Sequence, residues 1–225
     1  MKTFKQWQRP QALLLSSLVI FLSLVSTAAN AVNPRCHPPG EFDPIIVDLG
    51  QDGIHLGPAG MGVFFDLSGD GQLEYMQWTA PYGDEAFLVL DKNGNGLVDD
   101  GSELFTNFNM LVLDGEVSPN GFADLAQYDR VGLGGNDDGF ITRKDEVWTQ
   151  LKLWRDSNAD GVSTESEMFS LSYFDIKRFN TVPRINHRED AAGNILPLWG
   201  WAKKSRYSNG KRHFKVVDVF FKPLF

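Results

Sequence analysis

The sequence has few cysteines and lacks common catalytic motifs, which stabilise many exported proteins and carry out the chemistry of many enzymes. Its 225 residues contain one cysteine, Cys36, so no disulfide can form within the chain, and bound metal is an alternative source of rigidity. It has no Gly-x-Ser-x-Gly or His-Glu-x-x-His motif, and its four histidines are scattered, which argues against a conventional hydrolase and against a zinc site. A net charge of −8 disfavours nucleic acid as a partner.

Long apolar runs are confined to the beginning of the chain. Lys2, Lys5 and Arg9 precede an apolar run at residues 12–25, and a small-residue segment ends at Ala31. This order is typical of a secretory signal peptide, which we predict at residues 1–31. An uncleaved anchor is the alternative, although the run is shorter than the roughly 18 residues that a spanning helix needs. We therefore expect a secreted or periplasmic protein with no membrane span after signal cleavage.

The charged residues are unevenly distributed. Residues 32–167 contain 25 acidic and 7 basic side chains, whereas residues 168–225 contain 4 acidic and 11 basic ones. Because carboxylates at close range repel one another, divalent cations are expected to favour the compact state of the acidic segment. We interpret the basic segment as a solvated face that complements the acidic one, with an anionic lipid or polysaccharide surface as the alternative partner.

One acidic run fits the twelve-residue calcium loop of an EF-hand. In residues 156–167, oxygen-bearing side chains occupy loop positions 1, 3, 5 and 9, Gly161 occupies position 6, and a glutamate occupies position 12. A hard cation takes about six to eight oxygen ligands, so the backbone must wrap around it, and glycine permits the sharp turn. The predicted calcium ligands are Asp156, Asn158, Asp160, Val162 through its carbonyl, Thr164 and Glu167.

Two segments that follow predicted strands repeat this spacing. In the first, the glutamate comes one residue late, and Gly101 lets the loop accommodate the extra residue; the predicted ligands are Asp91, Asn93, Asn95, Leu97, Asp99 and Glu103. In the second, Gln77 stands at position 12; the predicted ligands are Asp66, Ser68, Asp70, Gln72 and Glu74. The alternatives are a Gly/Asn turn and a Gly-Asp-Gly hairpin, both without a ligand.

A fourth segment fits the spacing only if part of it loops out. Its strict position 1 is Gly134, which has no side chain, so Asp129 can take this place only if residues 130–135 bulge outwards. The predicted ligands are then Asp129, Asn136, Asp138, Phe140 and Asp145. A helix predicted at residues 144–154 would follow this segment and lead into the loop at 156–167, as in paired EF-hands.

Together these segments predict an α+β fold. We expect a calcium-loop-rich, EF-hand-like module of short strands and helices at residues 42–171, with an antiparallel β-sheet at residues 172–225 packed on it. The C-terminal sheet is predicted from aromatic and β-branched runs at residues 174–179, 198–204 and 213–221, which are separated by hairpin signals. A disordered leader is expected at residues 32–41.

The ordered set of motifs resembles a known family. The motifs are Asp-Pro-Ile-Ile-Val-Asp-Leu at 43–49, Phe-Phe-Asp-Leu-Ser-Gly-Asp-Gly at 64–71, Leu-Asp-Lys-Asn-Gly-Asn-Gly at 90–96, Asp-Asp-Gly-Ser-Glu-Leu-Phe at 99–105, Asn-Gly-Phe at 120–122 and Leu-Trp-Arg-Asp at 153–156. They are similar to the calcium-binding EF-hand-like modules of secreted bacterial proteins, including the self-processing module of RTX-type iron-regulated proteins. The likeness covers roughly residues 42–173.

This resemblance implies a cleavage site as well as calcium binding. In the self-processing relatives, calcium triggers cleavage of an Asp-Pro bond, and the new aspartyl end can be joined to a lysine amine. The matching residues here are Asp43 and Pro44, while Gly50 departs from an acidic residue that is usual in the family. The first expectation is an exported structural or adhesion-type module that stiffens on binding several calcium ions and has an unknown protein or polysaccharide partner. Self-cleavage at Asp43–Pro44 is the alternative.

Overall fold

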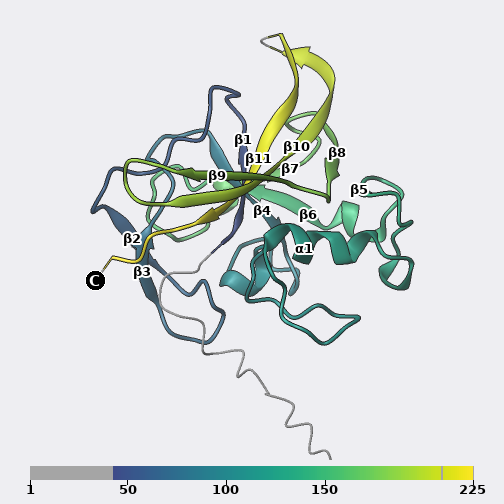
Figure 1. The fold of residues 1–225 in the computed structure, drawn as a ribbon, viewed down its shortest axis with the longest axis horizontal. Helices are drawn as coiled ribbons and strands as arrows, with labels where there is room; N and C mark the ends of the chain where they lie inside the picture. Colours follow the sequence, from purple (N-terminus) through teal and green to yellow (C-terminus); the bar gives the residue numbers. More distant parts are fainter. Residues whose placement is uncertain (1–42, 209, 225) are drawn as a thin grey trace, which may run out of the picture. The chain divides into compact units, whose positions relative to one another are not determined.

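The computed structural model describes residues 43–208 and 210–224, so the predicted signal peptide and leader lie outside it. Figure 1 shows a fold that consists mainly of strands. The strands are β1 (Ile45–Asp48), β2 (Gly62–Phe65), β3 (Glu74–Gln77), β4 (Glu85–Leu90), β5 (Phe140–Ile141), β6 (Leu151–Trp154), β7 (Met168–Ser170), β8 (Ile176–Asn180), β9 (Arg184–Glu189), β10 (Ile195–Ser208) and β11 (Lys211–Phe220). In the described residues the only α-helix is α1 (Gly121–Ala126).

Nine of these strands form one antiparallel sheet. Its order is β5-β8-β10-β11-β1-β4-β6-β7, with β9 paired to β10, and β2 and β3 form a separate hairpin. The first strand of the chain therefore lies between the last strand, β11, and β4. All four residues of β1 are buried, which agrees with its run of branched apolar side chains in the middle of a sheet.

Hydrophobic side chains cover both faces of the sheet. On one face Ile45 and Val47 of β1 pack in a cluster that includes Phe122 and Leu125 of α1. On the other face Ile46 packs in a cluster that includes Phe65 of β2. Because successive side chains of a strand point to opposite faces, a position in β1 or β11 determines which cluster its side chain joins.

The α+β prediction is wrong, because the chain is mostly antiparallel sheet and contains only one six-residue helix in the described part. The helix predicted at residues 144–154 is replaced by a 3-10 turn, Glu146–Thr149, and by strand β6. Leu151 and Leu153 face one cluster and Trp154 faces the other, so tertiary pairing with β4 decides the conformation of this short apolar run. The C-terminal strands also belong to the common sheet instead of forming a second one.

In this topology three of the four acidic loops follow strands and not helices. The loops that begin at Asp66, Asp91 and Asp156 follow β2, β4 and β6. The loop at Asp91 ends in the 3-10 turn Gly101–Glu103, and the loop at Asp156 ends in the 3-10 turn Glu165–Glu167. The chain therefore presents EF-hand-type loop sequences between strands and single 3-10 turns, not between the two helices of an EF-hand.

Candidate calcium loops and the Asp43–Pro44 bond

One hydrogen bond recurs in all four predicted loops. The carboxylate at position 1 accepts a hydrogen bond from the amide of the glycine at position 6, and each of these glycines has a positive φ. The pairs and their N–O distances are Asp66–Gly71 at 2.7 Å, Asp91–Gly96 at 2.9 Å, Asp129–Gly139 at 2.7 Å and Asp156–Gly161 at 2.8 Å. Four segments of different length therefore wrap their first carboxylate in the same way.

The loop at residues 156–167 brings its predicted side-chain ligands into one turn. Glu167 is buried and accepts hydrogen bonds from Ser157 N at 2.9 Å and from Thr164 Oγ1 at 2.9 Å, so it closes the loop from position 12. Asn158 donates to Asp160 at 2.7 Å, while the side chain of Val162 is exposed. Burial raises the pKa of Asp156, against the opposing effect of donors that include Gly161 and the Trp78 indole.

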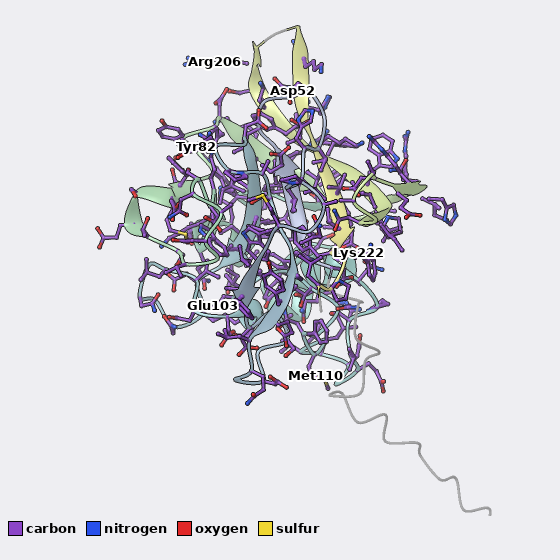
Figure 2. All side chains as sticks on the ribbon, turned by 90° about the vertical axis from the view of Figure 1, so that its left-hand side faces the viewer. Asp52, Tyr82, Glu103, Met110, Arg206 and Lys222 are labelled. Carbon is purple, nitrogen blue, oxygen red and sulfur yellow. The ribbon has the colours of Figure 1, made fainter. Side chains whose placement is uncertain are left out.

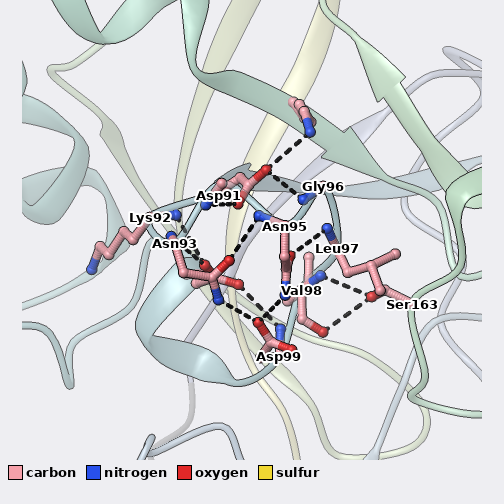
Figure 3. Close-up of polar contacts among 12 residues, drawn as sticks. Asp91, Lys92, Asn93, Asn95, Gly96, Leu97, Val98, Asp99 and Ser163 are labelled. Atoms are coloured by element: carbon pink, nitrogen blue, oxygen red, sulfur yellow. Dashed lines mark hydrogen bonds and ion pairs between the residues drawn. The ribbon is translucent and has the colours of Figure 1, made fainter.

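The loop at Asp91 closes in the same manner despite its extra residue (Figure 3). Glu103 accepts hydrogen bonds from Lys92 N at 2.9 Å and from Asp99 N at 3.1 Å. The side chains of Asn93 and Asn95 both donate to Asp99, at 2.6 and 2.7 Å, and Leu97 N bonds the side chain of Asn95 at 2.8 Å. The late glutamate therefore reaches the beginning of its loop.

This loop pairs with the loop at Asp156, a contact that the sequence did not predict. Val98 N donates to Ser163 Oγ at 2.8 Å, and Ser163 Oγ donates to Val98 O at 3.1 Å. Both residues occupy position 8 of their loops. The partner of the Asp156 loop at this contact is thus the Asp91 loop, and not the Asp129 segment.

The Asp129 segment does loop out as its spacing requires. Residues 130–135 close on themselves through the 3-10 turn Val131–Leu133, and Asp137 N then bonds Asp129 O at 2.7 Å. This brings together the side chains of Asp129, Asn136 and Asp138, with Phe140 N bonded to Asp138 at 3.2 Å, while Asp145 accepts a hydrogen bond from Thr142 N at 2.6 Å. Asp145 is buried, and no described residue supplies a hydrogen-bond partner for its Oδ1.

In the Asp66 loop the closing residue differs from the one that strict spacing gives. Glu74 accepts hydrogen bonds from Leu67 N at 2.8 Å and Ser68 Oγ at 2.9 Å, the part that Glu167 plays in its own loop. Carboxylate oxygens of Asp66, Asp70 and Glu74 lie within 4.8 Å of one another, and Gln72 N bonds Asp70 at 2.9 Å. Gln77, at the nominal position 12, lies in β3 with its amide group among the backbones of residues 57–60.

A further acidic cluster was missed by the sequence analysis. Carboxylate oxygens of Asp48, Asp52 and Asp84 lie within 4.8 Å of one another, and Asp48 accepts from Gly53 N at 3.0 Å. A Cβ at Gly50 would lie 1.5 Å from Asp84 Oδ2, so the Asp84 carboxylate fills the space of the missing acidic side chain. Asp48, Asp52 and Gly53 keep loop positions 1, 5 and 6, a signal that could have identified the turn. Asp52 lies far from Glu103 in Figure 2.

The donor sets of the four predicted loops fit a hard divalent cation. They consist of carboxylates, amide oxygens, hydroxyls and main-chain carbonyls, which are the ligands that calcium prefers. The buried, unpaired Oδ1 of Asp145 supports this fit, because a buried carboxylate oxygen without a partner is energetically costly. Basic side chains also reach two loops, since Lys152 Nζ lies 3.1 Å from Asp91 Oδ2 and Lys144 Nζ lies 3.3 Å from Asp138 Oδ2.

The Asp43–Pro44 bond lies immediately before β1. Pro44 O accepts a hydrogen bond from Val219 N of β11 at 3.1 Å, and Ile45 N donates to Phe105 O at 3.2 Å. Asp43 is fully buried, and its Oδ1 accepts a hydrogen bond from Asn107 N at 2.6 Å. The bond is thus fixed between the last strand and the segment that follows Glu103.

Two more buried carboxyl groups, Asp218 of β11 and Asp124 of α1, lie beside Asp43. Burial, together with the negative charge of Asp218, raises the pKa of Asp43 well above its usual value. Burial likewise raises the pKa of Asp218, and it raises that of Asp124 to about 6. Neither Asp124 nor Asp218 belongs to a recognisable sequence motif, so only the fold identifies them.

Comparisons with known proteins agree with these motifs. The family model described as SPM domain matches residues 45–222, which is most of the chain. The chain belongs to the SPM domain family. It is also 31% identical over 172 residues to iron-regulated protein FrpA of Neisseria meningitidis serogroup C. That alignment covers 76% of this chain and 15% of FrpA, so this chain corresponds to a small part of that relative.

The SPM match places the two candidate sites in context. It includes every predicted calcium ligand and Asp218, and it begins directly after Pro44. A relation to the self-processing module of FrpA is therefore shown. Within the described ranges of this SPM domain, no helix is both long and apolar enough to cross a bilayer.

Proposed function

We propose that this SPM domain is a calcium-dependent self-processing module that cleaves its own Asp43–Pro44 peptide bond. The observation that carries the proposal is the setting of Asp43. Its carboxyl group is fully buried directly before Pro44, is oriented by Asn107 N at 2.6 Å, and lies beside the buried carboxyl of Asp218. Strongly shifted carboxyl groups of this kind are typical of reactive sites, although ion-pair networks can also produce them.

The chemistry requires only groups of this chain and water. An oxygen of the ionised Asp43 carboxylate attacks the main-chain carbonyl carbon of the same residue, and the bond from that carbon to the Pro44 nitrogen breaks. The nitrogen takes up a proton, and Asp43 is left as a five-membered cyclic anhydride. Water then opens the anhydride to two carboxyl groups, or a lysine amine opens it to an amide. Because nucleophile and carbonyl belong to one residue, effective molarity replaces a separate nucleophile.

The fold connects the acidic loops to this bond. Glu103, which closes the Asp91 loop, is four residues before Asn107, and the intervening Phe105 bonds Ile45 N. The Asp129 segment follows α1, which carries Asp124. Calcium bound by these loops would neutralise their carboxylates and favour their folded form. Ordering of the loops would then place the Asn107 amide against Asp43.

The proposal is tested by mass spectrometry and N-terminal sequencing of the purified protein, prepared without calcium and then given calcium. We expect a fragment that begins at Pro44, and no such fragment from Asp43→Ala. The matched control is Asp114→Asn, which removes an exposed carboxylate that forms an ion pair with Arg130 and should leave cleavage unchanged. Failure of the parent to release the fragment, or its release from Asp43→Ala, would contradict the proposal.

A further inference from the structure

The sheet places Asp218 on the same face as the reacting residue. In the β1–β11 pair Asp218 lies opposite Ile45, and Val219 N bonds Pro44 O. Alternation along the strands puts Asp218 and Ile45 on the face covered by α1, and Asp43 precedes Ile45 by two residues. Residues diagonal to one another across an antiparallel pair are within reach of each other's side chains. Asp218 is thus brought to the Asp43–Pro44 bond by strand register.

The carboxyl groups of Asp43 and Asp218 share few hydrogen-bond donors. The Gly121 amide faces both groups and lies 3.2 Å from Asp218 Oδ1. The Oδ2 atoms of Asp43 and Asp218 are both buried without a hydrogen-bond partner among the described residues, and neither group forms an ion pair there. Two negative charges in such a site are strongly disfavoured. We therefore expect one of the two carboxyl groups to be protonated while the other is ionised.

The donors also indicate which group keeps that proton. Asp43 has the Asn107 amide at 2.6 Å in addition to the shared Gly121 amide, whereas in the described part of the chain Asp218 has only the shared one. Hydrogen bonds to a carboxylate favour its charged form, so the charge is better placed on Asp43. Asp124 faces the pair from α1, and the β10 residue opposite Asp218 is the apolar Leu198. This arrangement gives an ionised nucleophile beside a protonated acid.

We propose that Asp218 is the catalytic acid that protonates the Pro44 nitrogen as the Asp43–Pro44 bond breaks. The step rests on the self-cleavage proposed above. The Asp43 carboxylate forms the new C–O bond, the electron pair of the broken C–N bond stays on nitrogen, and the Asp218 carboxyl supplies the proton and becomes a carboxylate. A poor amide leaving group departs more readily when a positioned acid protonates it, and such help contributes about 10²- to 10⁴-fold in rate.

A purely electrostatic or structural role for Asp218 predicts a different result. If Asp218 only repelled Asp43, its replacement by asparagine would make Asp43 easier to ionise, and cleavage would become faster. If Asp218 only accepted the Gly121 hydrogen bond, asparagine could still accept it through its own side-chain oxygen, and the rate would change little. Only the acid role predicts that Asp218→Asn cleaves much more slowly than the parent while it still folds in the presence of calcium.

The test compares first-order cleavage rates of the parent, Asp218→Asn and Asp114→Asn at saturating calcium. Asp114→Asn is the control, because Asp114 is exposed, forms an ion pair with Arg130, and is not among the carboxyl groups that act on Asp43. We expect Asp218→Asn to be slower by about 100-fold or more. The cleavage rate of the control should differ from that of the parent by less than about threefold. Thermal melts in calcium verify that each variant folds.

The outcomes separate this inference from the proposed function. If the parent protein does not cleave the Asp43–Pro44 bond, both the proposed function and the role of Asp218 are wrong. A parent that cleaves while a folded Asp218→Asn cleaves equally fast or faster overturns only the role of Asp218. Should Asp218→Asn fail to fold, the pH profile of the parent decides: the acid role requires the rate to fall at high pH, where the pair loses its proton. A rate that stays on a plateau at high pH overturns it.

Discussion

The loop at Asp156 and the site at Asp43 both bury an aspartate, but they surround its carboxylate with different groups. Asp156 is 3% exposed and accepts hydrogen bonds from Asp160 N, Gly161 N and the Trp78 indole. Asp43 is 0% exposed, and its Oδ2 has no partner among the described residues. Burial raises the pKa of both groups, and the neighbouring Asp218 charge raises that of Asp43 further, whereas more donors oppose the effect at Asp156.

Removal of calcium should have the largest effect on this contrast. Several loops would lose a bound cation while the Asp43 site keeps its own atoms, so we expect chelation to lower the melting temperature by at least about 10 °C. Differential scanning calorimetry of the parent protein, with calcium and with a chelator, measures this change. Identical melts in the two conditions would mean that the loops do not hold calcium.

A substitution in one loop should have a smaller effect. Glu167→Gln removes one charge from the group that closes the Asp156 loop, so calcium binding at that loop should weaken by at least about tenfold. This corresponds to about 1.4 kcal/mol and, for a domain of this size, to a few degrees in calcium. Isothermal titration calorimetry measures the binding.

The matched control for this substitution is Glu165→Gln, which changes an exposed residue of the same 3-10 turn. It should leave both calcium binding and the melting temperature unchanged. If the two variants lose the same affinity, the general acidity of the segment matters and the closing position does not.

A separate effect is expected on the pH dependence of folding. Burial raises the pKa of Asp124 to about 6, so the folded state binds this proton more tightly than the unfolded state does. Ionisation of Asp124 therefore costs stability: its contribution decreases as pH rises from about 4 to 6, by about 2 kcal/mol in all. In chelator, Asp124→Asn should lack this part of the pH dependence measured by urea unfolding. If the stability of Asp124→Asn depends on pH as that of the parent does, the pKa of Asp124 is not raised.

The sequence predicted the loops better than the fold that connects them. The closure of the Asp91 loop by Glu103 and the outward bulge of residues 130–135 follow from local residue order. The helix at residues 144–154 failed because its apolar stripe is also compatible with a strand, and β4 supplied the partner. The position of Glu74 as the closing residue of its loop and the approach of Asp218 to Asp43 could not be predicted, because they depend on a hairpin and on the β1–β11 pairing.

If the chain cleaves itself as proposed, the pairing between β1 and β11 would also determine when the Asp43–Pro44 bond can be cut. Strand β1 leaves the ribosome early, whereas β11, with Asp218 and the Val219 amide, follows ten other strands. A nascent chain would therefore contain the Asp43–Pro44 bond before β11, whose Val219 amide bonds Pro44 O, has been made. Cleavage would then have to wait until β11 has been translated and paired with β1.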